Sequence, residues 1–221
     1  MSIRVLVVDD DALVRAGLKS MLESAGGMEV TVAVGAEALR AAREFEPDVA
    51  LLDVNMPDVG GIEVLAALRG LDSPPAVAML TAHGTQAAIT AALRNGAAGF
   101  LLKDTAPDEL VPAVRLLAVG GSALSPRAAH VVVDGFLAAG QRTCTRAAAA
   151  GRGAGLTERE EQVLGLVSEG LSNDEIACRL FLSRATVKDH VGAILNKLGA
   201  ANRVQAAVMA HRAADGTDAP S

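Results

Sequence analysis

The sequence predicts a doubly wound parallel α/β domain followed by a small all-helical domain. In residues 1–120, short apolar runs that end in a polar residue alternate with stretches of helical periodicity. Near-continuous apolar runs are typical of strands buried on both faces of a parallel sheet. From residue 156 onwards only helical periodicity remains. We therefore expect an α/β domain over 1–120, a linker over 121–155 and a helical domain over 156–215.

The first domain is expected to contain five βα units. Each strand is followed by a helical pattern, and right-handed crossovers then place helices on both faces of the sheet. Asp11 is expected to N-cap the first helix, and Pro107 stands near the first turn of the last one. Strands are predicted over 5–8, 30–34, 49–52, 76–80 and 100–102, and helices over 12–24, 36–45, 61–70, 85–95 and 107–119.

The rest of the chain divides into a linker and four helices. The linker is rich in Ala, Gly, Ser and Arg, and we expect one helix in it, over 126–139, before a flexible remainder. Thr157 with Glu160, and Ser172 with Glu175, have the spacing of capping boxes. Only a very short connection separates the second helix from the third, as in a helix-turn-helix. With Ser183 and Asn202 as further N-caps, the helices are predicted over 157–169, 173–180, 183–198 and 202–213.

Composition indicates a cytoplasmic protein. The 221 residues are 51% hydrophobic but only 2% aromatic, so the core must consist of Ala, Val and Leu. No stretch approaches the roughly 18 unbroken apolar residues of a membrane span, and no basic, apolar leader precedes the first strand. Cys144 and Cys178 are too few for a disulfide framework and lack the spacing of metal ligands.

The net charge of −6 conceals an asymmetry between the two halves of the chain. Residues 1–120 carry 9 Lys/Arg against 16 Asp/Glu, whereas residues 121–221 carry 11 against 10. Within 176–212 there are six basic residues and one acidic residue, a local charge of +5. Because local charge governs contact with a polyanion, this segment favours nucleic-acid binding although the whole chain is acidic.

Polar side chains follow four of the predicted strands. Asp9 and Asp10 come directly after the first strand, Asp53 after the third, Thr81 after the fourth and Lys103 after the fifth. Because the carboxyl ends of parallel strands share one edge of a sheet, these side chains should converge. Grouped carboxylates favour a hard cation such as Mg²⁺, and an Asp carboxylate can attack phosphorus. The ammonium and the hydroxyl would then bind the oxygens of a phosphoryl group.

These residues resemble the receiver domain of two-component response regulators. The motifs are Val7-Val8-Asp9-Asp10, Leu52-Asp53-Val54-Asn55-Met56-Pro57, Thr81-Ala82 and Leu101-Leu102-Lys103. The resemblance implies a (βα)5 flavodoxin-like fold in which Asp53 is the phosphoacceptor. It also implies a Mg²⁺ (or Mn²⁺) site made by Asp9, Asp10, Asp53 and the backbone carbonyl of Asn55. Thr81 would be the switch hydroxyl, Lys103 the phosphate-binding lysine and Phe100 the switch aromatic; the alternative for Phe100 is an ordinary core residue.

The third helix of the second domain has an apolar face and a polar face. Its apolar residues follow helical spacing, whereas Lys188, Asp189 and Gly192 lie on the opposite face, with Arg184 and Thr186 in the first turn. A helix that presents polar residues from its N-terminal half fits a DNA major groove. The motifs Leu156-Thr157-Glu158-Arg159-Glu160, Ser172-Asn173-Asp174-Glu175-Ile176-Ala177 and Thr186-Val187-Lys188-Asp189-His190-Val191 resemble the LuxR-type helix-turn-helix.

That second resemblance implies base-facing positions at Lys188, Asp189 and Gly192. Lys188 would bond a guanine edge or a phosphate, and Asp189 would accept from cytosine. Gly192 has no side chain with which to read a base and instead permits close approach of the DNA. Arg203 is a candidate for a phosphate contact.

The last helix resembles the element that pairs two DNA-binding domains in this family. Its small and apolar residues Val204, Ala207 and Val208 would form a two-fold dimer that matches a palindromic operator. The alternative is that these residues only close the core of their own domain.

Taken together, the chain resembles the NarL/FixJ subfamily of response regulators. This implies phosphorylation of Asp53 by a sensor histidine kinase, control of DNA binding and transcription, and dimerisation on activation. An aspartyl-phosphate hydrolase is disfavoured because enzymes of that class have a second Asp at the position where Asn55 stands. A nucleotide-binding dehydrogenase is disfavoured because no glycine-rich turn follows the first strand. We therefore do not expect an enzyme with a separate substrate. The remaining alternative is a DNA-binding regulator whose receiver is a phosphorylation-independent dimerisation module.

Overall fold

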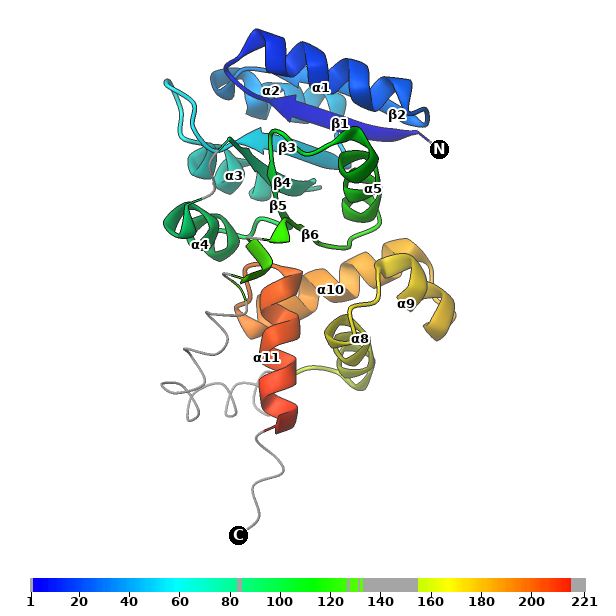
Figure 1. The fold of residues 1–221 in the computed structure, drawn as a ribbon. Coiled ribbons are helices and arrows are strands. Elements are labelled where there is room, and N and C mark those ends of the chain that lie inside the picture. The colour runs from blue at the N-terminus through cyan, green and yellow to red at the C-terminus, as the bar shows by residue number, and fades with distance from the viewer. Residues whose placement is uncertain (1, 83–84, 127, 131, 133–154, 216–221) are drawn as a thin grey trace. The chain divides into compact units, whose positions relative to one another are not determined.

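The chain forms two compact units, an N-terminal α/β unit and a C-terminal helical unit, each with its own hydrophobic core (Figure 1). The computed structural model describes residues 2–82, 85–126, 128–130, 132 and 155–215. Within these residues, no helix combines the length and the apolar character needed to cross a membrane.

The α/β unit is built on one parallel sheet with the strand order β2-β1-β3-β4-β5-β6. The central strands β1, β3 and β4 are almost completely buried, as their apolar runs predict. The strands are β1 (Ile3–Val8), β2 (Met28–Ala33), β3 (Val49–Asp53), β4 (Ala76–Thr81), β5 (Gly99–Leu102) and β6 (Ala123–Leu124).

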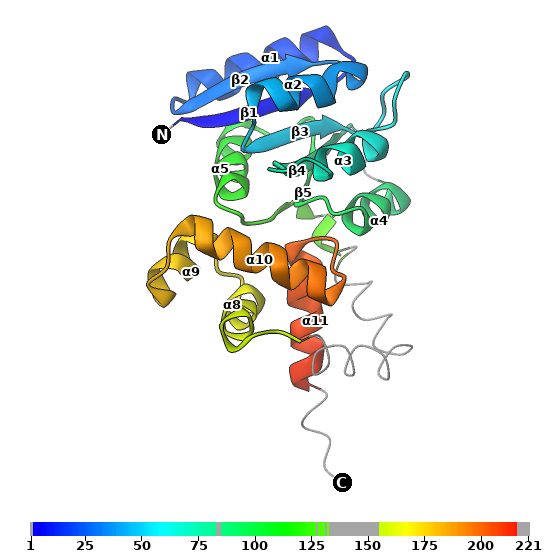
Figure 2. The ribbon, with the colours of Figure 1, turned by 180° about the vertical axis from the view of Figure 1, so that it is seen from behind.

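Helices cover both faces of this sheet, which confirms the predicted fold class. Helices α1 and α5 lie on one face and α2, α3 and α4 on the other (Figures 1 and 2). The core on the α1 and α5 side includes Val5, Leu22, Leu51, Leu80 and Val114. The helices are α1 (Ala12–Ser24), α2 (Ala38–Phe45), α3 (Gly61–Arg69), α4 (Gln86–Arg94) and α5 (Pro107–Ala118), with a 3-10 turn η1 (Gly35–Glu37) before α2.

The sheet departs from the prediction by more than one residue at two places. Strands β1 and β2 both begin two residues before their predicted starts, at Ile3 and Met28, because they pair with each other from there onwards. Strand β2 is an edge strand with alternating burial, and the exposed Glu29 interrupts the apolar run on which its prediction relied. Strand β6 was not predicted at all; its two residues pair in parallel with Gly99 and Phe100 of β5.

The helical unit contains four described helices, as predicted. The side chains of Thr157 and Ser172 form complete capping boxes with Glu160 and Glu175. Ser183 caps α10 through the backbone N–H of Thr186, and Asn202 accepts from the N–H of Gln205. The helices are α8 (Glu158–Ser168), α9 (Asn173–Leu180), α10 (Arg184–Leu198) and α11 (Arg203–Asp215).

Most of the predicted linker lies outside the described residues. Residues 126, 128–130 and 132 are helical, in agreement with the start of the helix predicted over 126–139. The remainder of that helix, the segment expected to be flexible after Gly140, and Cys144 are not among the described residues.

Candidate functional site

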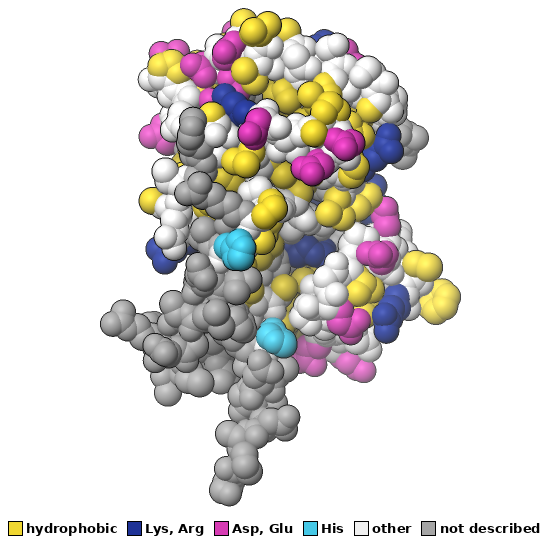
Figure 3. Space-filling view, in the orientation of Figure 1, with side chains coloured by type: hydrophobic (Ala, Val, Ile, Leu, Met, Phe, Trp, Pro, Cys, Tyr) yellow, Lys and Arg dark blue, Asp and Glu magenta, His cyan; other side chains and the backbone are white. Residues whose placement is uncertain are grey.

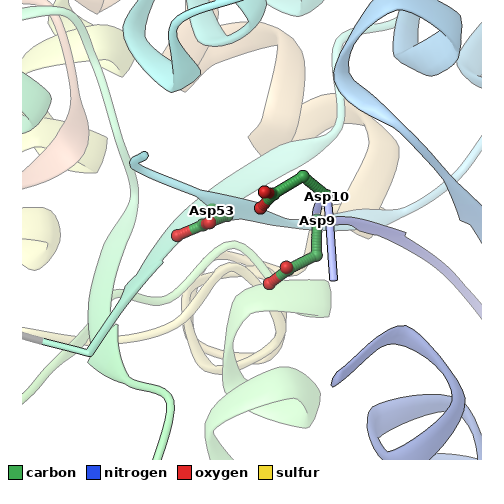
Figure 4. Close-up of side chains that lie close together, drawn as sticks. All are labelled: Asp9, Asp10 and Asp53. Carbon is green, nitrogen blue, oxygen red and sulfur yellow. The ribbon is translucent and has the colours of Figure 1, made fainter. Parts of the chain in front are cut away.

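Three carboxylates meet at the carboxyl edge of the sheet. Asp9 and Asp10 follow β1, Asp53 ends β3, and one oxygen from each lies within 4.8 Å of the others (Figure 4). Asp9 and Asp53 are buried, at 0% and 3% exposure, whereas Asp10 is exposed. The cluster therefore has a buried floor and one side open to solvent.

Lys103 provides the positive charge that faces this cluster. Its Nζ lies 2.7 Å from Oδ2 of Asp9 and 2.9 Å from Oδ2 of Asp53. Burial raises the pKa of the Asp53 carboxyl, and the Lys103 ammonium offsets this only in part. Burial lowers the pKa of Lys103, but its hydrogen bonds and charge interactions with Asp9 and Asp53 outweigh burial, so the net direction is upward. The ammonium is thus held firmly in its charged form.

Local backbone structure fixes the orientation of the carboxylates. The backbone N–H of Asp11 donates to Oδ1 of Asp9 at 2.9 Å, and the side chain of Asp11 caps α1, as predicted. The backbone N–H of Asn55 donates to the Asp53 carboxylate. Arg15 Nη1 donates to the backbone carbonyl of Asp9 at 2.7 Å.

Gly61 was not singled out from the sequence, yet it allows the end of β3 to sit against the start of α3. A Cβ at this position would lie 2.2 Å from the carbonyl oxygen of Asp53, a distance that no side chain tolerates. The pair Gly60-Gly61 directly before an apolar helix was the available signal.

Thr81 stands on β4, the strand next to Asp53, and Phe100 stands on β5, one strand further along the sheet. Asp53 pairs in register with Leu80, so Thr81 extends one residue beyond it on the neighbouring strand. Thr81 is fully buried, and its carbonyl accepts from the backbone N–H of Lys103 at 2.9 Å. Phe100 is also fully buried, in register with Met79 of β4. Burial of Phe100 agrees with both interpretations of this residue, the core and the switch.

The charge of the cluster fits a divalent cation. Three ionised carboxylates facing one ammonium leave a net charge of −2. All the side-chain donors are carboxylate oxygens, which Mg²⁺ prefers, and the exposed Asp10 leaves room for the waters that Mg²⁺ retains. These residues therefore form an acidic pocket suited to a divalent metal.

Helix α10 presents the predicted polar face of the helical unit. Val187 and Ile194 are buried in the core, whereas Lys188 and Asp189 are exposed. Apart from its chain neighbours and the backbone of its own helix, no atom lies within 4 Å of where a Cβ of Gly192 would stand, so no packing contact requires glycine at this position. Arg184 is exposed and Thr186 is half-buried in the first turn.

Arg203 and the last helix, α11, make contacts within the helical unit. The guanidinium of Arg203 donates to Oδ1 of Asn173 at 2.8 Å and to the carbonyl of Leu171. In α11, Val204 and Val208 are half-buried, and Ala207 packs against the core of the unit. The structure therefore gives Arg203 and Ala207 structural contacts in addition to the roles predicted for them.

A parallel sheet with an acidic edge, joined to a helix-turn-helix unit, defines the class of response regulators that bind DNA. Comparison with family models gives the family. The model described as response regulator receiver domain matches residues 5–115, and the one described as bacterial regulatory proteins, luxR family, matches residues 154–210. The chain therefore belongs to the LuxR-type response regulators. It is a transcription regulator with a receiver and a DNA-binding domain, not an enzyme that turns over a separate substrate.

Relatives match almost end to end. The chain is 36% identical to the transcriptional regulatory protein LnrK of Bacillus subtilis, over 95% of this chain and 97% of LnrK. It is 37% identical to the DNA-binding transcriptional activator DevR/DosR of Mycobacterium tuberculosis, over 94% of each chain. Among solved structures, the response regulator ChrA of a heme-sensing two-component system matches with a TM-score of 0.51 and 35% identity, over 97% of this chain and 98% of ChrA.

Proposed function

We propose that Asp53 accepts a phosphoryl group from a histidine kinase and that this controls sequence-specific DNA binding through α10. The observation that carries the proposal is the buried Asp53 carboxylate, which ends its strand between two further acids and the ammonium of Lys103. A nucleophile for phosphorus needs neighbouring positive charge to accept the incoming oxygens, and this edge provides it.

In the proposed step, a carboxylate oxygen of Asp53 attacks the phosphorus of a phosphohistidine. A P–O bond forms as the P–N bond breaks, and the kinase imidazole leaves and takes up a proton. Asp9, Asp10, Asp53 and the backbone carbonyl of Asn55 would hold Mg²⁺ or Mn²⁺, which neutralises charge on the transferring group when bound. The ammonium of Lys103, already 2.9 Å from Oδ2 of Asp53, would bind one phosphoryl oxygen, and the hydroxyl of Thr81 would donate to another. Phe100, on the strand next to that of Thr81, would change its position when Thr81 moves toward the phosphoryl group.

The test of the phosphorylation site is labelling by a small phosphodonor, acetyl phosphate, in the presence of Mg²⁺. We expect the wild-type chain to be labelled and Asp53→Asn to remain unlabelled. Asp58→Asn is the matched control, because Asp58 is an exposed carboxylate five residues away and should not alter labelling. Labelling of Asp53→Asn at the wild-type rate would overturn the assignment.

The DNA contacts are proposed from the exposed face of α10 and from Arg203 at the start of α11. Lys188 and Asp189 would contact base edges, Arg184, Thr186 and Arg203 would contact or position the phosphate backbone, and Gly192 would allow close approach. We expect Lys188→Ala to weaken binding to a selected duplex and to reduce its dependence on salt, because one cation is lost. Lys19→Ala, which removes an exposed lysine of α1, is the control and should bind as the wild type does.

We further propose that activation forms a two-fold dimer through Val204, Ala207 and Val208 on a palindromic operator. Support comes from the half-buried Val204 and Val208, which leave apolar surface on α11. We expect Val204→Glu to prevent dimers in sedimentation with beryllofluoride, the phosphoryl analogue. Equal dimerisation of wild type with and without the analogue would favour the alternative, a receiver that acts as a phosphorylation-independent dimerisation module.

A further inference from the structure

Arg15 is a cation at the end of a helix where positive charge is unfavourable. It closes the first turn of α1, where its backbone N–H donates to the carbonyl of Asp11 at 3.0 Å. The N-terminus of a helix carries partial positive charge, which favours acidic rather than basic side chains there. The helix itself therefore gains no electrostatic stabilisation from an arginine at this position.

The guanidinium of Arg15 reaches back to the acidic pocket instead. Its Nη1 donates to the backbone carbonyl of Asp9 at 2.7 Å, and the side chain is half-buried. Hydrogen bonds from a charged donor are shorter and stronger than those between neutral groups. Because the peptide bond is planar, the carbonyl of Asp9 and the N–H of Asp10 move as one group. Arg15 thus holds the peptide plane that joins the two acids.

This peptide matters because the Asp10 carboxylate has no restraint of its own. The carboxylate of Asp9 is held by the backbone N–H of Asp11 at 2.9 Å and by the ammonium of Lys103 at 2.7 Å. The side chain of Asp10 is exposed and makes no hydrogen bond or ion pair with the residues that the structure describes. The direction of this side chain therefore depends on its backbone. Mg²⁺ demands near-ideal octahedral geometry, so a misdirected carboxylate is lost as a ligand.

We propose that Arg15 is a positioning residue for the metal pocket: its hydrogen bond to the carbonyl of Asp9 keeps the Asp10 carboxylate directed at the cation. The inference rests on the proposed function, which assigns Mg²⁺ to this pocket, and it adds a residue outside the set of ligands. Loss of a partner that orients a metal ligand typically weakens metal binding by about 10–100-fold.

The sign of the effect separates positioning from simple charge. Residues 1–120 carry 16 acidic against 9 basic side chains, and Figure 3 shows acidic side chains over the visible face of the α/β unit. Loss of a cation beside the pocket makes the local potential more negative and attracts Mg²⁺ more strongly. Charge alone therefore predicts tighter Mg²⁺ binding by Arg15→Met, whereas positioning predicts weaker binding.

The test is a titration of the full chain with Mg²⁺, followed through the backbone amide NMR signals of Asp10 and Asn55. We expect Arg15→Met to bind Mg²⁺ at least about tenfold more weakly than the wild type. Arg15→Gln, a polar but neutral and shorter side chain, should show the same loss. Arg15→Lys keeps a charged donor of similar reach and should stay within about threefold of the wild type.

Lys19→Met is the matched control. It removes a cation of the same helix, whose Nζ lies 3.7 Å from the exposed Glu23. This variant should bind Mg²⁺ as the wild type does, because Lys19 makes no contact with the peptide between the acids.

A double-mutant cycle shows whether Arg15 acts through Asp10. In the Asp10→Asn background the carboxylate that Arg15 directs is gone, so Arg15→Met should then change Mg²⁺ affinity by less than about threefold. Labelling by acetyl phosphate gives a second readout. Arg15→Met should need more Mg²⁺ for half of its maximal rate, yet should approach the wild-type rate when Mg²⁺ is saturating.

Several results would overturn the inference. Unchanged or tighter Mg²⁺ binding by Arg15→Met and Arg15→Gln is one, and an equal loss with and without the Asp10 carboxylate is another. A labelling rate that no concentration of Mg²⁺ restores would also count against it. Variants that melt lower in EDTA but keep their Mg²⁺ affinity would show that the hydrogen bond only stabilises α1. Failure of the wild type to bind Mg²⁺ would overturn the proposed function first.

Discussion

Replacement of Lys103 by Met removes the single ammonium that contacts two buried carboxylates. Asp9 Oδ2 and Asp53 Oδ2 lie 2.7 and 2.9 Å from its Nζ, and the side chain of Lys103 is 20% exposed. Met has similar length and fills similar space, so the change is mainly one of charge. Without a bound metal ion, the two acids would then face each other with no cation between them.

The size of the effect follows from these contacts. Breaking a buried ion pair by removing one partner costs about 3–5 kcal/mol. The loss has an upper bound of about 4 kcal/mol at pH 7, because Asp53 can take up a proton instead, starting from an ordinary pKa of 3.8. We therefore expect Lys103→Met to lower the free energy of unfolding of the α/β unit by about 3 kcal/mol, which corresponds to roughly 10 °C in Tm.

The assay is calorimetry of the full chain in EDTA, followed by titration with Mg²⁺. The transition that Mg²⁺ shifts is that of the α/β unit, and Mg²⁺ should recover more stability in Lys103→Met than in wild type. Lys19→Met is the control, because its pair with Glu23 is exposed and spans 3.7 Å; it should change stability by less than about 0.5 kcal/mol. Adding Asp53→Asn to Lys103→Met should restore part of the loss. A Lys103→Met transition within 1 °C of wild type in EDTA would refute the reasoning.

Three further predictions concern other groups. Burial raises the pKa of Asp53, so its destabilising effect is absent below pH 3.8, grows as pH rises above that value and is complete above the folded pKa. Asp53→Asn should therefore be the more stable form at pH 7 in EDTA, and chemical denaturation that finds it less stable contradicts this. Lys197, with Nζ 2.6 Å from Oε2, lowers the pKa of Glu160 to about 2, so this pair contributes stability above pH 4.5 that is lost as pH falls toward 2. Lys197→Met should raise that pKa toward 4.5 in an NMR titration, and an unchanged value would disprove the pairing. Gly61→Ala should destabilise the α/β unit by about 1–3 kcal/mol in thermal melts, because a Cβ would lie 2.2 Å from the Asp53 carbonyl; an unchanged Tm would show that the backbone can yield there.

The elements that the sequence predicted well are those with strong local signals. Helix α9 was predicted over the residues that it occupies, because the capping box at Ser172 marks its start and the N-cap Ser183 of the next helix leaves room for only a short connection after it. Strand β3 was predicted with an error of one residue, because its apolar run ends at Asp53. Convergence of Asp9, Asp53 and Lys103 followed from one topological rule, that the carboxyl ends of parallel strands share an edge.

The features that the sequence did not predict depend on contacts between distant segments. Strand β6 has two residues and no periodicity, and it is a strand only because β5 offers it hydrogen bonds. The start of β2 depends on its register with Ile3. The contact of Arg203 with Asn173 joins residues 30 positions apart, so no local pattern could reveal it. Gly61 required knowledge of how closely α3 approaches β3.

The central claim is that occupation of Asp53 by a phosphoryl group controls DNA binding. The most direct measurement is the affinity of the full chain for the selected duplex with and without beryllofluoride, for wild type and Asp53→Asn at the same Mg²⁺ concentration. We predict that the analogue increases the affinity of the wild type by at least about tenfold and leaves Asp53→Asn unchanged, since a coupling of 1–3 kcal/mol is typical of such switches. Equal affinity of the wild type in both conditions, or an equal response of both proteins, would contradict the claim.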